Sequence, residues 1–164
     1  MTIAWHYTTG EHFQGICQSM QIALETGPVI DPKERRCVWF TTAETYEATA
    51  LKARVSGDGT VTAFQTAAEQ APFCRGLVRI GVPTALLFPY SQWRKRAHVH
   101  SLIAAGMESI AIAAGSDPHA HWHFTCKPVS SASWVAVEFS VDGERWFSDP
   151  SEALADYPAV PVTA

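Results

Sequence analysis

The spacing of apolar residues changes once within the first 20 residues, and this change most constrains how the chain folds. From Ile3 to Thr8 the side chains alternate as in a strand: Ile3, Trp5 and Tyr7 face one side, and Ala4, His6 and Thr8 face the other. Apolar residues then recur at intervals of three and four, which predicts one buried helix face made of Phe13, Ile16, Cys17 and Met20. A strand followed directly by an amphipathic helix indicates a fold that mixes both elements.

Hydroxyl residues mark the points where two helices are expected to begin. In the segment Thr8–Glu11 a hydroxyl precedes a glutamate by three residues, which is the capping-box pattern. The buried strand expected at Cys37–Phe40 is followed by a second such pattern, Thr41–Glu44, which predicts a helix through about Arg54. The two helix N-termini, near Thr9 and Thr42, would offer backbone N–H groups and positive dipole ends to an anion.

The rest of the chain predicts further strands and helices, with no linker that would divide it. The polar segment Glu25–Arg36, with one glycine and two prolines, is expected to be a loop. Expected strands lie around residues 60–66, at Leu77–Val82, and at Trp134–Val141, the last followed by a two-residue turn at Asp142-Gly143 and a return at Arg145–Phe147. Expected helices span Leu102–Ala114 and Ser151–Asp156. We therefore predict an α+β protein, with a single mixed domain over residues 1–157 and a disordered tail at 158–164.

Composition and charge argue against several classes of protein. The net charge of −4 leaves no broad basic face for duplex DNA. Because the chain has no run of 18 apolar residues, no membrane span is expected. The four cysteines form no C-x-x-C pair, and the first strand begins without a preceding secretory signal. We therefore expect free thiols and a cytoplasmic location.

Two short motifs stand in the first third of the chain: H-Y-T-T at His6–Thr9 and W-F-T-T at Trp39–Thr42, the second followed by Glu47. This order resembles the bacterial and phage ADP-ribosyltransferase-like proteins, including their DNA-modifying toxin branch, in which a strand histidine is closely followed by Ser or Thr. The resemblance covers residues 3–54, with a weaker continuation at Arg79–Val82, at Trp122 and at Trp134–Trp146. It implies an ADP-ribosyltransferase-like split sheet with helices, and a toxin or phage-defence role. The implied activity is transfer of ADP-ribose from NAD to a protein or nucleic-acid target.

The same resemblance implies which residues bind NAD and which act on it. The implied NAD-binding residues are His6, Tyr7, Thr8, Trp39, Phe40, Thr41, Thr42 and Tyr46, with His6 also implied as catalytic. Departure of nicotinamide leaves an oxocarbenium-like ribose, which a glutamate stabilises. In the family this glutamate lies late in the chain on a strand, so Glu138 is the first choice, and Glu47 and Glu108 follow it.

Other interpretations stay open at this point. The chain has no clear E-x-E or Q-x-E pair, which favours a catalytically inactive relative that binds a nucleotide or protein partner. His6 also fits a half-buried strand histidine, and Glu138 fits the solvent face of a hairpin strand. The threonines of both motifs fit simple helix caps.

Two further groups of residues suggest partners. His98 and His100 precede a second group, His119, His121, His123 and Cys126, whose histidines would converge on a zinc ion if they alternated along a strand. Pro118 interrupts such a strand and no carboxylate is placed to orient the imidazoles, so we expect no metal. A basic and aromatic patch would contact a protein or single-stranded nucleic acid: Tyr90, Trp93, Arg94, Lys95 and Arg96.

Overall fold

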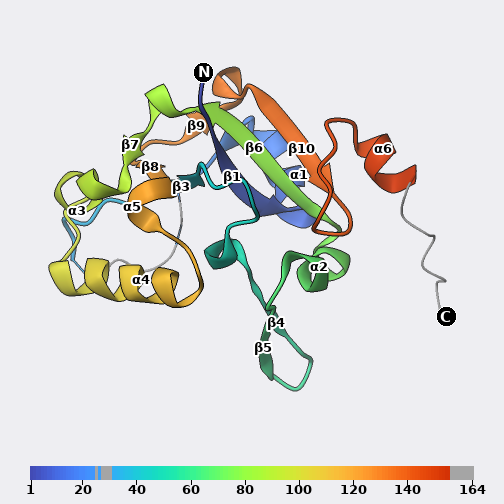
Figure 1. Cartoon of the computed structure of the whole chain (residues 1–164), viewed down its shortest axis with the longest axis horizontal. Helices are drawn as coiled ribbons and strands as arrows, with labels where there is room; N and C mark the ends of the chain where they lie inside the picture. The colour runs from blue at the N-terminus through green and yellow to red at the C-terminus, as the bar shows by residue number, and fades with distance from the viewer. Residues whose placement is uncertain (25, 27–30, 156–164) are drawn as a thin grey trace.

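One six-stranded antiparallel sheet organises the computed structural model, which describes residues 1–24, 26 and 31–155. Its strands run in the order β10 (Ala136–Ser140), β6 (Leu77–Pro83), β1 (Ile3–Thr9), β3 (Val38–Thr41), β8 (Trp122–Thr125) and β7 (Phe88–Pro89). Figure 1 shows β10, β6 and β1 side by side as the longest strands, with the C-terminal helix beside β10. The described residues therefore form a single compact domain that mixes helix with antiparallel sheet.

Shorter elements surround this sheet. The α-helices are α1 (Gly10–Ser19), α2 (Ala67–Gln70), α3 (Trp93–Arg96), α4 (Ser101–Ala113), α5 (Pro118–His121) and α6 (Pro150–Ala155). The 3-10 helices are η1 (Ala48–Ala50), η2 (Ala71–Cys74), η3 (Thr84–Leu86), η4 (Tyr90–Gln92) and η5 (Ser131–Ser133). Two small antiparallel pairs complete the list: β2 (Gln21–Ile22) with β9 (Val129–Ser130), and β4 (Ala53–Val55) with β5 (Val61–Ala63). Figure 1 shows the β4–β5 hairpin projecting away from the rest of the chain.

The two faces of the sheet bury different sets of residues. One face packs against α1 and holds the main aliphatic core, which includes Ala4, Ile80 and Phe40. The other face is covered by α3 and α4 on the β3–β8 side, where an aromatic cluster forms around Trp93, Trp122 and Phe124. A third, smaller cluster includes Ala71 and Leu77 and lies near α2. Side chains that alternate along β1 therefore enter two separate environments.

The junction between β1 and α1 depends on a glycine. Gly10 is the first residue of α1, and a side chain there would collide with the backbone carbonyl of Arg75. Thr9 caps the helix, because its hydroxyl accepts a hydrogen bond from the His12 N–H at 3.3 Å. The helix begins directly at the end of the strand, as its sequence predicts, but the capping residue is Thr9 and Thr8 belongs to the strand.

Most expected strands and helices are confirmed, including those at β1, β3, β6, β10, α4 and α6. The helix expected from Thr41 through about Arg54 is wrong: Thr41 ends β3, and the residues after it contain only η1 and the start of β4. Tertiary contacts override the helical preference there, because Glu47 is held by donors from distant segments. The expectation that Cys17 and Met20 are buried is also wrong, since both are exposed and only Phe13 and Ile16 pack on the core.

The connection after β10 is wider than the expected two-residue turn. The chain does return beside β10, where Phe147 exchanges two backbone hydrogen bonds with Phe139. Between them the Asp142 carboxylate accepts hydrogen bonds from the N–H groups of Glu144 and Arg145, which holds a longer loop. This loop brings Trp146 back over the sheet.

Two expectations lie wholly or partly outside the described residues. The tail at 158–164 is one, and the loop at Glu25–Arg36 is described only at residues 26 and 31–36. Within the described part of the chain, no helix is long and apolar enough to cross a membrane.

Candidate functional site

A row of three polar side chains crosses the long strands on the face opposite α1. Tyr7 of β1 pairs with Arg79 of β6, and Arg79 pairs in turn with Glu138 of β10. Residues directly opposite each other in an antiparallel sheet share a face, so these three side chains lie side by side. On the other face, which packs against α1, the same three strands contribute apolar side chains to the main core. The sheet therefore places a phenol, a guanidinium and a carboxylate in a line.

Arg79 is held tightly at the centre of this row. Its Nε donates to Glu138 Oε2 at 2.7 Å, and the two side chains form an ion pair with exposed fractions of 14% and 21%. Its guanidinium carbon also lies 4.3 Å from the ring centroid of Trp5 and 4.5 Å from that of Trp146. A guanidinium over aromatic faces is attracted by their π electrons, and that attraction grows as water is excluded. Arg79 is thus fixed by one carboxylate and two indole rings.

Aromatic rings from two loops and one strand form a wall beside the row. The Tyr7 ring centroid lies 4.6 Å from that of Tyr46 and 5.8 Å from that of Trp146. The rings of Tyr46 and Trp146 are nearly parallel, with an angle of 11° between their planes. Burial raises the pKa of both tyrosines, so their hydroxyls stay protonated at neutral pH. The Tyr7 hydroxyl donates to the Thr45 carbonyl at 3.4 Å.

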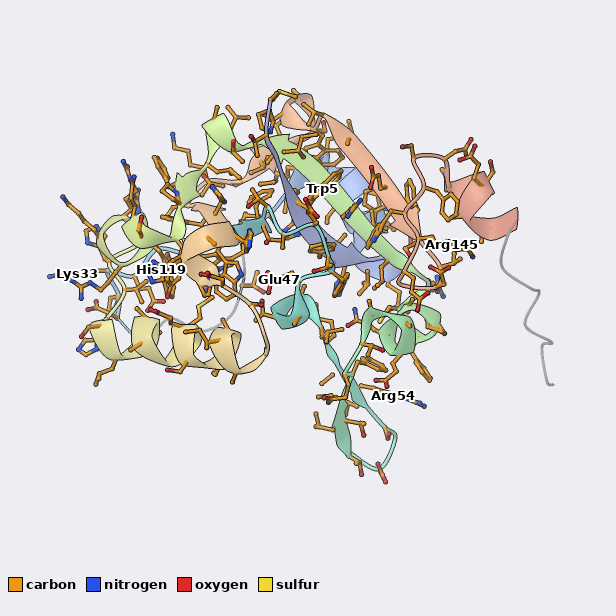
Figure 2. All side chains as sticks on the ribbon, in the orientation of Figure 1. Trp5, Lys33, Glu47, Arg54, His119 and Arg145 are labelled. Atoms are coloured by element: carbon orange, nitrogen blue, oxygen red, sulfur yellow. The ribbon has the colours of Figure 1, made fainter. Side chains whose placement is uncertain are left out.

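Glu47, the second candidate carboxylate, is occupied by donors and is only 8% exposed. It accepts hydrogen bonds from Trp122 Nε1 at 3.0 Å, from the Thr49 hydroxyl at 3.0 Å and from the Ser116 hydroxyl. Figure 2 labels Glu47 in the loop below the strand that carries Trp5. Because Ser116 and Trp122 are distant in the sequence, Glu47 ties its own loop to the start of β8 and to the loop after α4.

Glu108, the third candidate, lies on α4 and is remote in the fold from the row. Its carboxylate lies 3.2 Å from His119 Nε2, and its side chain is 36% exposed. His119 and His121 belong to the helix α5 and His123 to β8, so they do not alternate along one strand. Among the described residues, no group of three His, Cys, Asp or Glu is arranged to hold a metal ion.

His6 lies on the face opposite the row. It pairs with Ile80, whose side chain belongs to the main core, and its ring contacts that of Phe40 at 5.7 Å between centroids. His6 Nδ1 lies 3.0 Å from the Trp39 carbonyl oxygen, which can only accept, so Nδ1 donates. Burial lowers the pKa of His6, so the imidazole is neutral at pH 7. The structure therefore brings His6 together with the Phe40 ring and the Trp39 carbonyl, whereas the Trp39 ring packs on Trp93. Glu138 lies on the other face of the sheet.

The threonines of the two motifs are largely buried. Thr8, on the same face as His6, is 8% exposed, and Thr41 is 2% exposed. The Thr41 hydroxyl accepts from the Ala43 N–H at 3.1 Å, and the Thr42 hydroxyl lies 3.4 Å from His121 Nδ1. The next helical element in the described chain is the 3-10 helix η1, which begins at Ala48, so Thr42 offers no helix N-terminus to an anion.

The basic and aromatic patch separates into two parts. Tyr90 and Trp93 are each 5% exposed and pack with Trp39 and Trp122, so their rings cannot stack on a base. The consecutive cations at residues 94–96, at the end of α3, are exposed.

Sequence reasoning did not identify Arg79, Trp5 or Trp146 as site residues. One signal was present for Arg79, which is the single charged residue in the otherwise apolar strand Leu77–Pro83. Its partner Glu138 lies 59 positions away, so their pairing depends on the strand register alone.

Comparisons of this chain with protein-family models, with curated proteins and with solved structures find no match.

Proposed function

We propose that this protein is an NAD-dependent ADP-ribosyltransferase-like enzyme with the fold of that family, and that it transfers ADP-ribose to a protein or nucleic-acid target. The observation that supports this most is the row Tyr7–Arg79–Glu138, which presents a carboxylate beside aromatic rings on one sheet face. The resemblance of the motifs at His6–Thr9 and Trp39–Thr42 gives the reaction class.

The chemistry assigned to Glu138 is electrostatic. In ADP-ribose transfer the bond between the nicotinamide nitrogen and ribose C1′ breaks, and its electron pair leaves with neutral nicotinamide. The ribose then carries positive charge until a nucleophile of the acceptor attacks C1′ and loses its proton. A carboxylate held near C1′ stabilises that charge as it develops. Glu138 suits this role because its side chain remains 21% exposed while Arg79 fixes its orientation.

The aromatic wall suits the nicotinamide end of NAD. The nicotinamide ring of NAD is a flat cation, and aromatic faces attract such rings. Tyr46 and Trp146, which are only partly buried, supply these faces, and the buried Tyr7 ring packs against both of them. His6 has a positioning role in this proposal, because its bond to the Trp39 carbonyl holds β1 against β3.

A binding protein without catalysis is the second candidate function. It is favoured by the ion pair between Arg79 and Glu138, which already neutralises the carboxylate that catalysis needs. In that case the same face holds a nucleotide or a protein partner and no bond breaks.

Both candidate functions can be tested by incubating the pure protein with NAD. Two quantities are measured: the nicotinamide released and the rise in Tm that NAD causes. Turnover supports the enzyme, and a rise in Tm without turnover supports the binding protein. Glu138→Gln should lower turnover by about 100-fold, or roughly 3 kcal/mol, while it leaves NAD affinity nearly unchanged. Glu108→Gln is the matched control, because its carboxylate lies outside the row.

His6→Ala separates positioning from catalysis. It should lower NAD affinity and rate together, because it loosens β1 against β3 without removing a charge from the row. If Glu138→Gln keeps full turnover while Glu47→Gln or Glu108→Gln abolishes it, Glu138 is the wrong carboxylate. If the protein neither releases nicotinamide nor is stabilised by NAD, both candidate functions are rejected.

A further inference from the structure

A cavity of about 710 Å³ lies beside the edge strand β7, at the other end of the sheet from β10 and its residue Glu138. Phe88 of β7, the end of α3 and the segment after β8 form its walls, and Figure 1 shows these elements close together. Basic side chains dominate the lining: Arg35, Lys95, Arg96, His98 and Lys127. None of the lining residues that the structure describes carries a carboxylate.

This concentration of positive charge runs against the charge of the whole chain. The protein carries a net charge of −4, yet four of its 12 lysines and arginines line this one cavity. Among residues 1–24, 26 and 31–155, none of these four has an acidic partner within ion-pair distance. Like charges that stay close without such partners attract an anion from solution.

Arg96 is oriented in advance of any ligand. Its Nε donates to Gln92 Oε1 at 2.6 Å, and its guanidinium carbon lies 3.7 Å from the ring centroid of Phe88. These contacts fix the plane of the guanidinium and use only one of its five N–H groups. A planar guanidinium held in this way matches the geometry of phosphate oxygens and loses little freedom on binding.

His98 occupies a backbone conformation that usually belongs to glycine. It follows the C-terminal residue of α3 by two positions and has a φ of 55°. Glycine or asparagine is the usual residue at this point, and a larger side chain there costs free energy. Because this residue is a histidine, an imidazole lines the cavity where a glycine would leave no side chain.

The ligand is indicated by what the cavity lacks as well as by its charge. Tyr90 and Trp93 are buried, and the exposed face of Phe88 is covered by Arg96, so the site offers no ring on which successive bases could stack. Its volume lies within the range of small-molecule sites, roughly 300–1,000 Å³. These features favour a compact anion over an extended single strand.

We propose that this cavity binds a compact phosphorylated anion, such as an inorganic polyphosphate or the phosphate chain of a nucleotide. This inference goes beyond the proposed function and does not depend on it, because the cavity and the row Tyr7–Arg79–Glu138 share no residue.

Isothermal titration of the full chain with sodium tripolyphosphate tests the proposal, with ATP and a single-stranded oligothymidylate as further ligands. Lys95→Gln and Lys127→Gln each remove one charge from the cavity and should weaken tripolyphosphate binding by at least about fivefold. Arg94→Gln is the matched control: it removes the same charge from the same helix but lies outside the lining, so it should change binding by less than about twofold. A higher salt concentration should weaken the binding of tripolyphosphate to the wild-type chain, because salt screens the charges.

Saturable binding of tripolyphosphate that follows this pattern supports the proposal. Tighter binding of ATP would then identify a nucleotide as the source of the phosphate groups, and equal binding would identify free polyphosphate. The proposal is overturned if tripolyphosphate does not saturate the protein, or if Arg94→Gln weakens binding as much as Lys95→Gln does. The proposal is also overturned if the protein binds the oligothymidylate but does not bind tripolyphosphate. Circular dichroism of each variant checks that the fold is kept, which is expected because these side chains are exposed.

Discussion

Replacing Arg79 by methionine tests whether the row on the sheet is held by electrostatics or only by packing. Methionine keeps most of the unbranched side chain between Trp5 and Trp146, so the substitution removes mainly the charge. The Glu138 side chain, which is only 21% exposed, then keeps its charge without the guanidinium partner.

The cost of this change follows from two contributions. Breaking a fully buried ion pair by removing one partner costs about 3–5 kcal/mol, and the partial exposure here reduces this to about 1–2 kcal/mol. Loss of two cation–π contacts adds about 0.5–1 kcal/mol each. We therefore expect Arg79→Met to lower the free energy of unfolding by about 3 kcal/mol, and Tm by roughly 6–12 °C for a chain of this size.

Urea unfolding of a double-mutant cycle separates the two contributions. Glu138→Gln leaves no carboxylate to be stranded, so the double variant with Arg79→Met should cost about 1–2 kcal/mol less than the sum of the single variants. Arg75→Met is the control, because its contact with Glu11 is 3.9 Å long and exposed, and it should change stability by less than about 0.5 kcal/mol. Strict additivity of the two single variants would refute the electrostatic explanation of the row.

Three further predictions concern the cysteines, Glu47 and Asp142. Thiol titration of denatured, unreduced protein should find four free thiols, and in the native protein exposed Cys17 should react first and Cys37 last, because burial raises the pKa of the Cys37 thiol. Glu47→Ala should lower the free energy of urea unfolding by about 2–4 kcal/mol, because Trp122 Nε1 and two hydroxyls lose their acceptor. Burial opposes ionisation of Asp142, but hydrogen bonds from backbone and side-chain donors outweigh it and lower its pKa to about 2. Its stabilisation of about 1–2 kcal/mol is therefore complete above its usual pKa and is lost as pH falls toward 2, which unfolding of Asp142→Asn across that range should reveal by a flatter profile.

The long strands of the sheet could be predicted from the number and spacing of their apolar residues. In β1 the side chains alternate with a period of two, and β6 and β10 carry enough apolar residues to be recognised as buried. The residues after Thr41 could not be predicted in the same way. Their composition suits a helix, but Glu47 finds donors on β8 and in the loop after α4, which no local pattern records.

The candidate site could be predicted only in part for a related reason. The sequence identifies Glu138 as a late strand carboxylate and Tyr7 as the aromatic residue of the first motif. It does not reveal that Arg79 lies between them, because strand register is a property of the assembled sheet. Trp146 joins the site only because the loop after Ser140 is longer than the sequence suggests.

The position of His6 changes how the first motif should be understood. β1 pairs with β6 at seven positions but with β3 at one, Trp5 with Thr41. The imidazole supplies a further link between β1 and β3, since its Nδ1–H donates to the Trp39 carbonyl. This bond favours a charged imidazole, but burial among apolar residues outweighs it, lowers the pKa of His6 and keeps the ring neutral. Since neighbours along a strand face opposite sides, the same link fixes the direction of Tyr7 toward Arg79 and Glu138. In the function proposed above, the two residues therefore have separate tasks: His6 positions the strand on one face, and Glu138 is assigned the charge of the ribose on the other.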